Sequence, residues 1–206
     1  MTFLVDGTNG GTFPSWTTAT RPASPAVGQM GYNTTTGNFD QYTAGGWVTT
    51  INSSTGIVQA SQMPTGSVLQ VVQASYGTAV TVSTTTHVTT GLTASITPKF
   101  STSKILVLIN NPMRRTGTSP SGYGANIFVY RNGSPIFNPM TNIGFTDTAL
   151  TNTPISWLVP IMYLDSPATT SSTTYAMWFA AVVNGNNITS CIDNNLATIQ
   201  LLEIAG

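Results

Sequence analysis

The alternation of apolar and polar residues constrains this chain more than any other feature of its sequence. In residues 87–97, HVTTGLTASIT, the even positions hold Val88, Leu92, Ala94 and Ile96, and the odd positions are polar. A period of two places the apolar side chains on one face of an extended strand. The segment therefore predicts a strand with one dry face and one solvated face.

Similar segments recur between turn residues from position 67 onward. They cover residues 67–73, 79–83, 87–97, 104–110, 125–137, 155–165, 174–183 and 197–204. About eight to ten strands in a region of this size predict a β-sandwich, most plausibly of the jelly-roll type. Pro160 predicts an edge strand or a bulge. Asn132-Gly133 and Asn184-Gly185 each predict a tight hairpin turn.

One of these segments, KILVLIN at residues 104–110, is apolar on both faces, which predicts a central strand covered on both sides. Composition agrees with an all-β fold, because strand-forming Thr, Val, Ile, Tyr and Phe are abundant. Only 6% of residues are charged and the net charge is zero. Such a chain lacks the usual electrostatic protection against self-association.

The N-terminal third differs in character from the rest. Residues 1–20 predict an extended arm, and residues 21–51 predict a small meander with strands at about 28–33, 38–42 and 46–51. Residues 52–66 have the composition of a linker, which leaves residues 67–206 for the sandwich. We expect the arm to dock on another protein, because it carries hydrophobic residues that it cannot bury alone.

Aromatic residues are concentrated in the arm and the meander, and about 30 residues are too few to bury them. We therefore expect them to pack against another chain or domain, with stacking on sugars as the alternative. The predicted assembly interface consists of Phe13, Trp16, Tyr32, Phe39, Tyr42 and Trp47.

A second candidate binding site is the predicted loop at residues 110–124, NNPMRRTGTSPSGYG. Arg114 and Arg115 form the only pair of adjacent basic residues, and Tyr123 lies nearby in the sequence. Guanidinium groups suit an anionic surface sugar or an acidic residue of a neighbouring capsid protein. The alternative is a solvated loop tip without a ligand.

The sequence gives little support for catalysis. His87, expected on the polar face of a strand, is the one histidine, and no nucleophile-elbow motif accompanies it. Cys191 predicts a small buried residue. Asp147, Asp165 and Asp193 are candidates for a glycosidase pair but read better as turn residues. We expect no enzyme activity, no cofactor and no metal.

The sequence also argues against two classes of partner. No basic patch of useful size is present, so we expect no nucleic-acid binding. No apolar run reaches the length of a membrane helix, and the first residues do not form a signal peptide, so we expect no membrane insertion.

The block at residues 21–48, RPASPAVGQMGYNTTTGNFDQYTAGGWV, resembles a short module of phage, especially cyanophage, virion fibre and structural proteins. Arg21, Pro22, Pro25, Gly28, Tyr32, Asn33, Gly45, Gly46 and Trp47 carry the resemblance. Residues 66–111, 163–175 and 197–206 are similar to a C-terminal domain of aquatic phage fibres. Together these regions cover most of the chain beyond residue 20.

The resemblance implies a trimeric β-sandwich at a virion surface, without catalytic residues. The expected function is that of a fibre or spike protein that contacts the host surface, with a host glycan as the candidate ligand and with the arm bound to tail or capsid proteins. Because no shaft repeats are present, a capsid decoration (cement) protein is the alternative. A glycan-cleaving enzyme is a remote third possibility. The expected location is the virion, assembled in the host cytoplasm.

Overall fold

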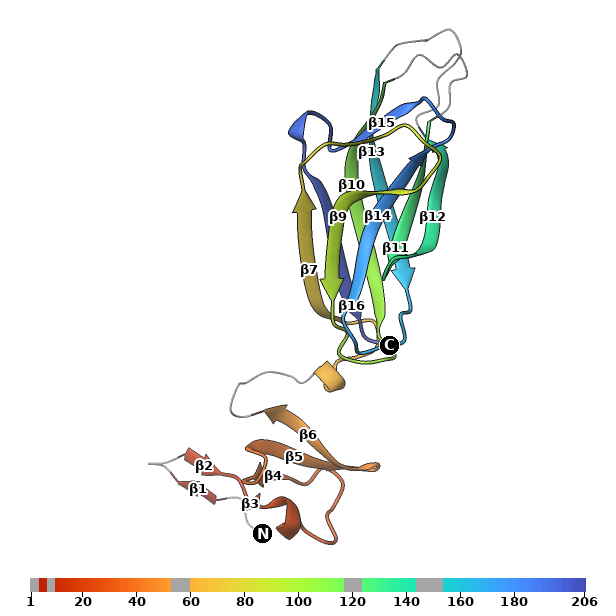
Figure 1. Ribbon diagram of the computed structural model, residues 1–206. Coiled ribbons are helices and arrows are strands. Elements are labelled where there is room, and N and C mark those ends of the chain that lie inside the picture. The colour runs from red at the N-terminus through yellow and green to blue at the C-terminus, as the bar shows by residue number, and fades with distance from the viewer. Residues whose placement is uncertain (1–3, 7–9, 53–59, 117–123, 144–153) are drawn as a thin grey trace. The chain divides into compact units, whose positions relative to one another are not determined.

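The computed structural model describes residues 4–6, 10–52, 60–116, 124–143 and 154–206. The chain forms two compact units, Met1–Met63 and Pro64–Gly206, and each is described by itself. The described residues lie mainly in strands, which confirms the predicted all-β class (Figure 1). Short 3-10 helices connect some of them: η1 (Thr18–Thr20), η2 (Ala60–Gln62) and η4 (Ile192–Asn194).

The small unit contains a four-stranded sheet in the order β3-β4-β5-β6. Its strands are β3 (Ser15–Trp16), β4 (Met30–Asn33), β5 (Asn38–Thr43) and β6 (Gly46–Asn52). The last three form the predicted antiparallel meander, whereas β3 runs parallel to β4. Part of the predicted arm is therefore a strand of this sheet. β1 (Leu4–Asp6) and β2 (Gly10–Thr12) form a separate antiparallel pair.

One layer of the large unit is a six-stranded antiparallel sheet centred on a long strand, β10. Its strands are β7 (Val68–Tyr76), β8 (Val80–Val82), β10 (Lys104–Thr116), β13 (Ile155–Asp165), β15 (Asn187–Ser190) and β16 (Ala197–Ile204). On one side β10 pairs with β13 along most of its length. On its other side β10 pairs first with β16 and then with β15. β7 extends the sheet beyond β16, and β8 extends it beyond β15.

The other layer is a four-stranded antiparallel sheet in the order β12-β11-β14-β9. Its strands are β9 (Val88–Ile96), β11 (Ala125–Arg131), β12 (Ser134–Ile143) and β14 (Thr173–Ala181). The two layers enclose one core, and the chain passes between them several times (Figure 1). Sequence-distant segments are thus neighbours, as expected for a sandwich.

Alternation along the strands produces this core. Along β10 the odd-numbered side chains are buried, including Ile105, Val107 and Ile109. β9 likewise buries Leu92 and Ala94 and turns intervening residues outward. The predicted period-two reading of these segments is therefore confirmed. Other fully buried members of the core include Ile127, Val129, Val159, Met177, Phe179, Ile199 and Leu201.

The prediction of a loop starting at residue 110 is wrong, because β10 continues to Thr116. Asn110, Asn111 and Pro112 suggested a turn, but the sheet accommodates the proline. On one side of β10, pairing with β16 ends at Asn110 and pairing with β15 begins at Met113. Pro112, which lacks a backbone N–H, lies in this gap and therefore interrupts no described pair on that side.

Pro160 lies in β13, which pairs only with β10 among the described strands and is therefore an edge strand, as predicted. The register opposes Asn110 to Pro160 and Pro112 to Leu158. Residues two apart in an antiparallel ladder share the same pairing type. The same register therefore allows both Pro112 and Pro160 to occupy positions where the hydrogen bonds between β10 and β13 do not require a backbone N–H.

The two predicted Asn-Gly hairpins have different outcomes. Asn132 and Gly133 both have positive φ, 49° and 82°, and join the paired strands β11 and β12. Gly185 also has a positive φ, but it follows β14 and precedes β15, which belong to different sheets. The predicted second hairpin is therefore wrong, and that turn connects the two layers.

Candidate functional site

The centre of the small unit is the carboxylate of Asp40, which is 0% exposed. Arg21 forms an ion pair with it at 2.9 Å, and the Asn33 amide nitrogen donates to it at 2.8 Å. The Trp16 indole N–H and the Thr49 hydroxyl also donate to this carboxylate, at 3.3 and 3.4 Å. One carboxylate thus joins residues from four separate parts of the unit.

Three of the nine motif residues that carry the phage resemblance, Arg21, Asn33 and Trp47, lie at or next to this carboxylate. Arg21 binds Asp40 and also lies 5.8 Å from the centre of the Trp47 ring, a cation–π distance. Asn33 binds Asp40 and, through its oxygen, accepts from the backbone N–H of Thr35. These residue types are therefore explained by the internal architecture of the unit.

Close packing restricts another position of the same block. A Cβ atom at Gly31 would lie 2.2 Å from the ring of Trp16 and 2.7 Å from the carbonyl oxygen of Pro14. Both neighbours belong to the segment around β3, which lies against β4. Only glycine allows this approach of the two strands.

The six aromatic residues predicted to form an assembly interface pack largely against one another. Edge-to-face pairs join Trp16 to Trp47, Tyr42 to Trp47, Phe13 to Phe39 and Tyr32 to Phe39, with ring centres 5.1–5.6 Å apart. Trp16 is buried within the unit, whereas Phe13 is 43% exposed and the remaining four are half-buried. An interface role for the more exposed rings stays a prediction.

The predicted basic site does not exist as one surface. Arg115 is 2% exposed and lies on the buried side of β10, so it is not available for an external ligand. Arg114 lies on the opposite face, where it binds Asp193 through two nitrogens and donates to the Ser156 hydroxyl at 3.0 Å. Successive side chains of a strand point to opposite faces, which separates the two guanidinium groups. The prediction of a loop did not include this alternation. Tyr123 lies outside the described residues.

His87 belongs to an aromatic cluster on the outer side of the four-stranded sheet. Its ring stacks on Phe128 at 3.7 Å, and its Nδ1 lies 2.7 Å from the Tyr130 hydroxyl. Tyr130 in turn stacks on Trp178 at 4.4 Å. Phe128 and Tyr130 are each 8% exposed, so the chain itself covers most of this cluster. His87 was expected on the polar face of a strand; it lies just before β9, is half-buried and packs against aromatic rings, so that expectation is wrong.

A partly buried charged cluster lies at one end of the sandwich. Asp165 accepts two hydrogen bonds from Arg131, at 2.8 and 3.0 Å, and one from the Tyr175 hydroxyl at 2.6 Å. Burial, reinforced by the hydrogen bond to Asp165, raises the pKa of Tyr175 well above its usual range. The same carboxylate raises the pKa of Arg131 through its hydrogen bond.

This cluster predicts a loss of stability in alkali. Because the folded-state pKa of Tyr175 is raised, the contribution of this residue to the free energy of unfolding is complete below the unfolded-state pKa of about 10. That contribution is lost as the pH rises further. The stability advantage of wild type over Tyr175→Phe should therefore shrink by about 1.4 kcal/mol per pH unit above pH ~10. Urea denaturation of both proteins between pH ~8 and ~11.5 measures it. A difference that stays constant with pH contradicts the prediction.

The few carboxylates of the chain are mostly used inside the fold. Glu203 is 0% exposed; it accepts from the Gln70 side chain at 2.5 Å and from the Lys99 backbone N–H at 2.7 Å. Asp40 and Asp165 are also buried, and Asp193 is paired with Arg114. Asp147 lies outside the described residues. Asp165 and Asp193 therefore act as ion-pair partners of arginines.

Cys191 is fully buried, which confirms its prediction as a small buried residue. It belongs to a polar cluster behind β10, where the Ser190 hydroxyl donates to the Asn111 side-chain oxygen at 3.1 Å. The Asn111 amide nitrogen donates back to Ser190 at 2.9 Å. This cluster satisfies polar groups inside the sandwich and lies away from solvent.

The outer face of the six-stranded sheet was not identified as a site from the sequence. Its central residues form cross-strand rows: Val71, Leu202, Leu106 and Leu164 in one row, and Gln73, Gln200, Leu108 and Met162 in the next. Met162 is 74% exposed, Val71 59%, Leu158 57% and Leu164 50%. We call this surface, from Val71 on β7 to Leu164 on β13, the outer face.

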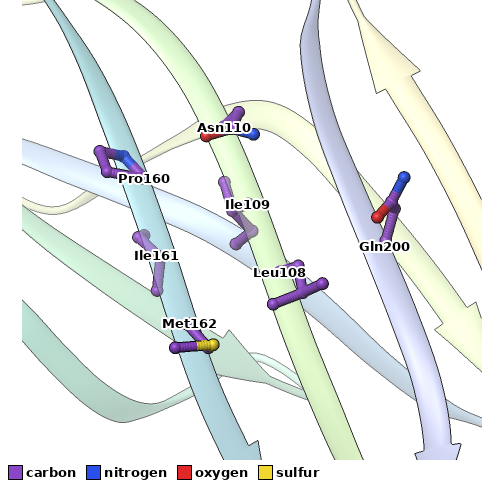
Figure 2. Close-up of a pocket in the computed structure, with 7 residues that line it drawn as sticks. All are labelled: Leu108, Ile109, Asn110, Pro160, Ile161, Met162 and Gln200. Carbon is purple, nitrogen blue, oxygen red and sulfur yellow. The ribbon is translucent and has the colours of Figure 1, made fainter.

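A hollow of about 440 Å³ lies in the outer face between β16, β10 and β13. Figure 2 shows the side chains of Gln200, Leu108 and Met162 on its three strands, with Asn110 and Pro160 one step further along. The predicted covering of both faces of residues 104–110 is wrong for this chain alone, because Leu106 and Leu108 are only half-buried.

No group of three or more His, Cys, Asp or Glu side chains is arranged to hold a metal ion in the part of the chain that is described. Among the same residues, no helix has the length and apolar character needed to cross a membrane.

No protein-family model matches the chain, and no curated protein matches its sequence. Solved structures with a partly similar fold include a T=1 particle derived from infectious bursal virus, with 10% identity over 78% of this chain and a TM-score of 0.38. The VP2 subviral particle of infectious bursal disease virus matches over 68% at 11% identity, with a TM-score of 0.33. Latent PorU from Porphyromonas gingivalis matches over 77% at 11% identity, with a TM-score of 0.29. The chain spans 43%, 38% and 15% of those three chains.

Proposed function

We propose that this chain is a non-enzymatic structural protein of a phage virion, a homotrimeric fibre or spike that contacts the host surface. The observation that carries the proposal is the internal use of charge. Within the described residues, three of the six carboxylates are buried, and a fourth is paired with an arginine. A surface with few free charges favours association with copies and neighbouring virion proteins.

The phage-like block supports the same proposal. Arg21, Asn33 and Trp47, which carry the sequence resemblance, all take part in the arrangement around Asp40. Residues of this kind keep a small module folded when few side chains are available for its core. Such a module is suited to attachment between larger virion components.

A capsid decoration protein is the second candidate, favoured by the absence of shaft-like repeats in the sequence. Copy number distinguishes the two. Quantitative mass spectrometry of purified virions, with the major capsid protein as internal standard, should find a few copies per particle for a tail spike. Hundreds of copies per particle would establish decoration of the head instead, and none would contradict a virion role.

The host contact is tested by adsorption competition. Purified protein should reduce adsorption of the virus to its host cells. If Arg114 leaves its ion pair with Asp193 to bind an anionic glycan, Arg114→Ala should weaken this competition. Thr141→Ala, an uncharged change at an exposed position of the four-stranded sheet, is the matched control. Competition that is absent in the wild type contradicts the receptor role. Release of sugars from host glycans, followed by mass spectrometry, would contradict the non-enzymatic assignment.

A further inference from the structure

We infer that the outer face of the six-stranded sheet is the surface through which copies of this chain bind one another. This inference rests on the proposed assembly role and adds to it the location of the contact.

The exposed apolar side chains are contiguous. Met162 and Leu164 are neighbours on β13, and Leu164 is linked through Leu106 and Leu202 to Val71 at the far edge. Single exposed hydrophobic residues are common on protein surfaces, whereas a continuous patch marks an interaction site. Residues 104–110 are apolar on both sides, which is typical of a strand covered on both sides.

The distribution of charge favours the outer faces of other copies as the partner, and three such faces can meet around the axis of the proposed trimer. The two central rows contain leucine, valine, methionine and glutamine, but no charged side chain. The charged groups on this side of β10 lie at its two ends, Lys104 at one and Arg114 with its partner Asp193 at the other. Two such faces can therefore meet without removing a charge from water.

The extent of the face fits a small contact between copies. Four strands about 4.8 Å apart span about 19 Å, and the rows of Leu106, Leu108 and Asn110, about 6.7 Å apart, span about 20 Å, which gives roughly 390 Å² in projection. A contact between two copies would then bury at most roughly 800 Å², which is below the ~1,000 Å² of a typical specific interface and suits a weak association. The hollow beside Pro160 offers space for a side chain of the partner, such as Met162.

In the part of the chain that is described, the four-stranded sheet offers no comparable surface. On its outer side Phe128 and Tyr130 are each 8% exposed, because His87 and Trp178 stack over them. That side has therefore already buried its largest apolar groups within the chain. The outer face of the six-stranded sheet leaves Met162 74% exposed.

The test is sedimentation velocity of the full chain at concentrations from roughly 1 to 100 μM. Wild type should sediment as an oligomer, and Met162→Asp and Leu164→Asp should each raise its dissociation constant at least tenfold. Val27→Asp, at a position 71% exposed on the small unit, is the matched control and should leave the oligomer unchanged. Circular dichroism checks that each variant keeps its fold, which is expected for such exposed positions.

A second measurement needs no mutation. Met162 should be oxidised by peroxide at high dilution and protected at concentrations where the oligomer forms, while Met30 of the small unit should react equally at both. An oligomer that is insensitive to Met162→Asp, with Met162 still reactive, overturns the inference but leaves the assembly role standing. Wild type that remains a protomer throughout overturns both.

Discussion

Replacing Asp40 with alanine is expected to unfold the small unit selectively. The change removes the common acceptor of Arg21, Asn33 and Trp16, and two of those donors are themselves buried. Buried groups left without a partner, together with a broken ion pair, should lower the free energy of unfolding by about 3 kcal/mol. Hydrogen–deuterium exchange should therefore show roughly hundredfold weaker protection of β4, β5 and β6.

The large unit provides an internal reference in the same experiment, since protection of β10 and β16 should not change. Thr36→Ala, an exposed position in the turn before β5, is the matched control and should have little effect. Equal exchange in β5 of wild type and Asp40→Ala would show that the carboxylate does not organise the unit.

Asp165→Ala is expected to have the second large effect, and it should act on the large unit. The variant leaves the Tyr175 hydroxyl, on a side chain that is 0% exposed, without its acceptor, and it removes both hydrogen bonds from Arg131 to this carboxylate. We expect a loss of about 3 kcal/mol, or a decrease of roughly 10 °C in the melting temperature of this unit. Differential scanning calorimetry measures both quantities.

Tyr175→Phe separates the contributions within this cluster, because it removes one hydrogen bond and leaves the Arg131–Asp165 pair intact. It should lower the melting temperature by only about a third as much as Asp165→Ala. If the two variants are equally stable, the ion pair contributes nothing and the tyrosine bond carries the whole effect.

Much of the fold followed from sequence patterns because those patterns are local. The strand at residues 87–97, the meander at residues 21–51 and the turn at Asn132-Gly133 depend on alternation and on residues that favour positive φ. The edge position of β13 followed from Pro160 for the same reason. Each strand and each turn among these features is decided within about ten residues of the chain.

The errors concern features that depend on distant contacts. Residues 110–116 were predicted as a loop because a strand accepts a proline only where no partner strand needs its N–H. Such a place exists between the ends of β16 and β15, but it arises from the packing of distant strands and is not visible in the local sequence. For the same reason Arg115 could not be recognised as buried. Asp40 gave no signal beyond its position between aromatic residues, and its partners come from segments up to 24 residues away.

The exposed row of β13 could have been found in the sequence. Alternate residues Leu158, Pro160, Met162 and Leu164 are apolar, and so are Val159, Ile161 and Tyr163 between them. In a two-layer fold only one face of an edge strand packs against the core, so the second apolar face of such a strand remains exposed.

The central rows of the outer face, which contain no ionised group, have a physical consequence for any contact made there. Attraction between charges weakens as salt is added, whereas apolar association is unaffected or strengthened. Nor does protonation alter leucine, methionine or glutamine in mild acid. An assembly joined at Leu106, Leu108 and Met162 would therefore keep its cohesion in fresh water and in brine alike.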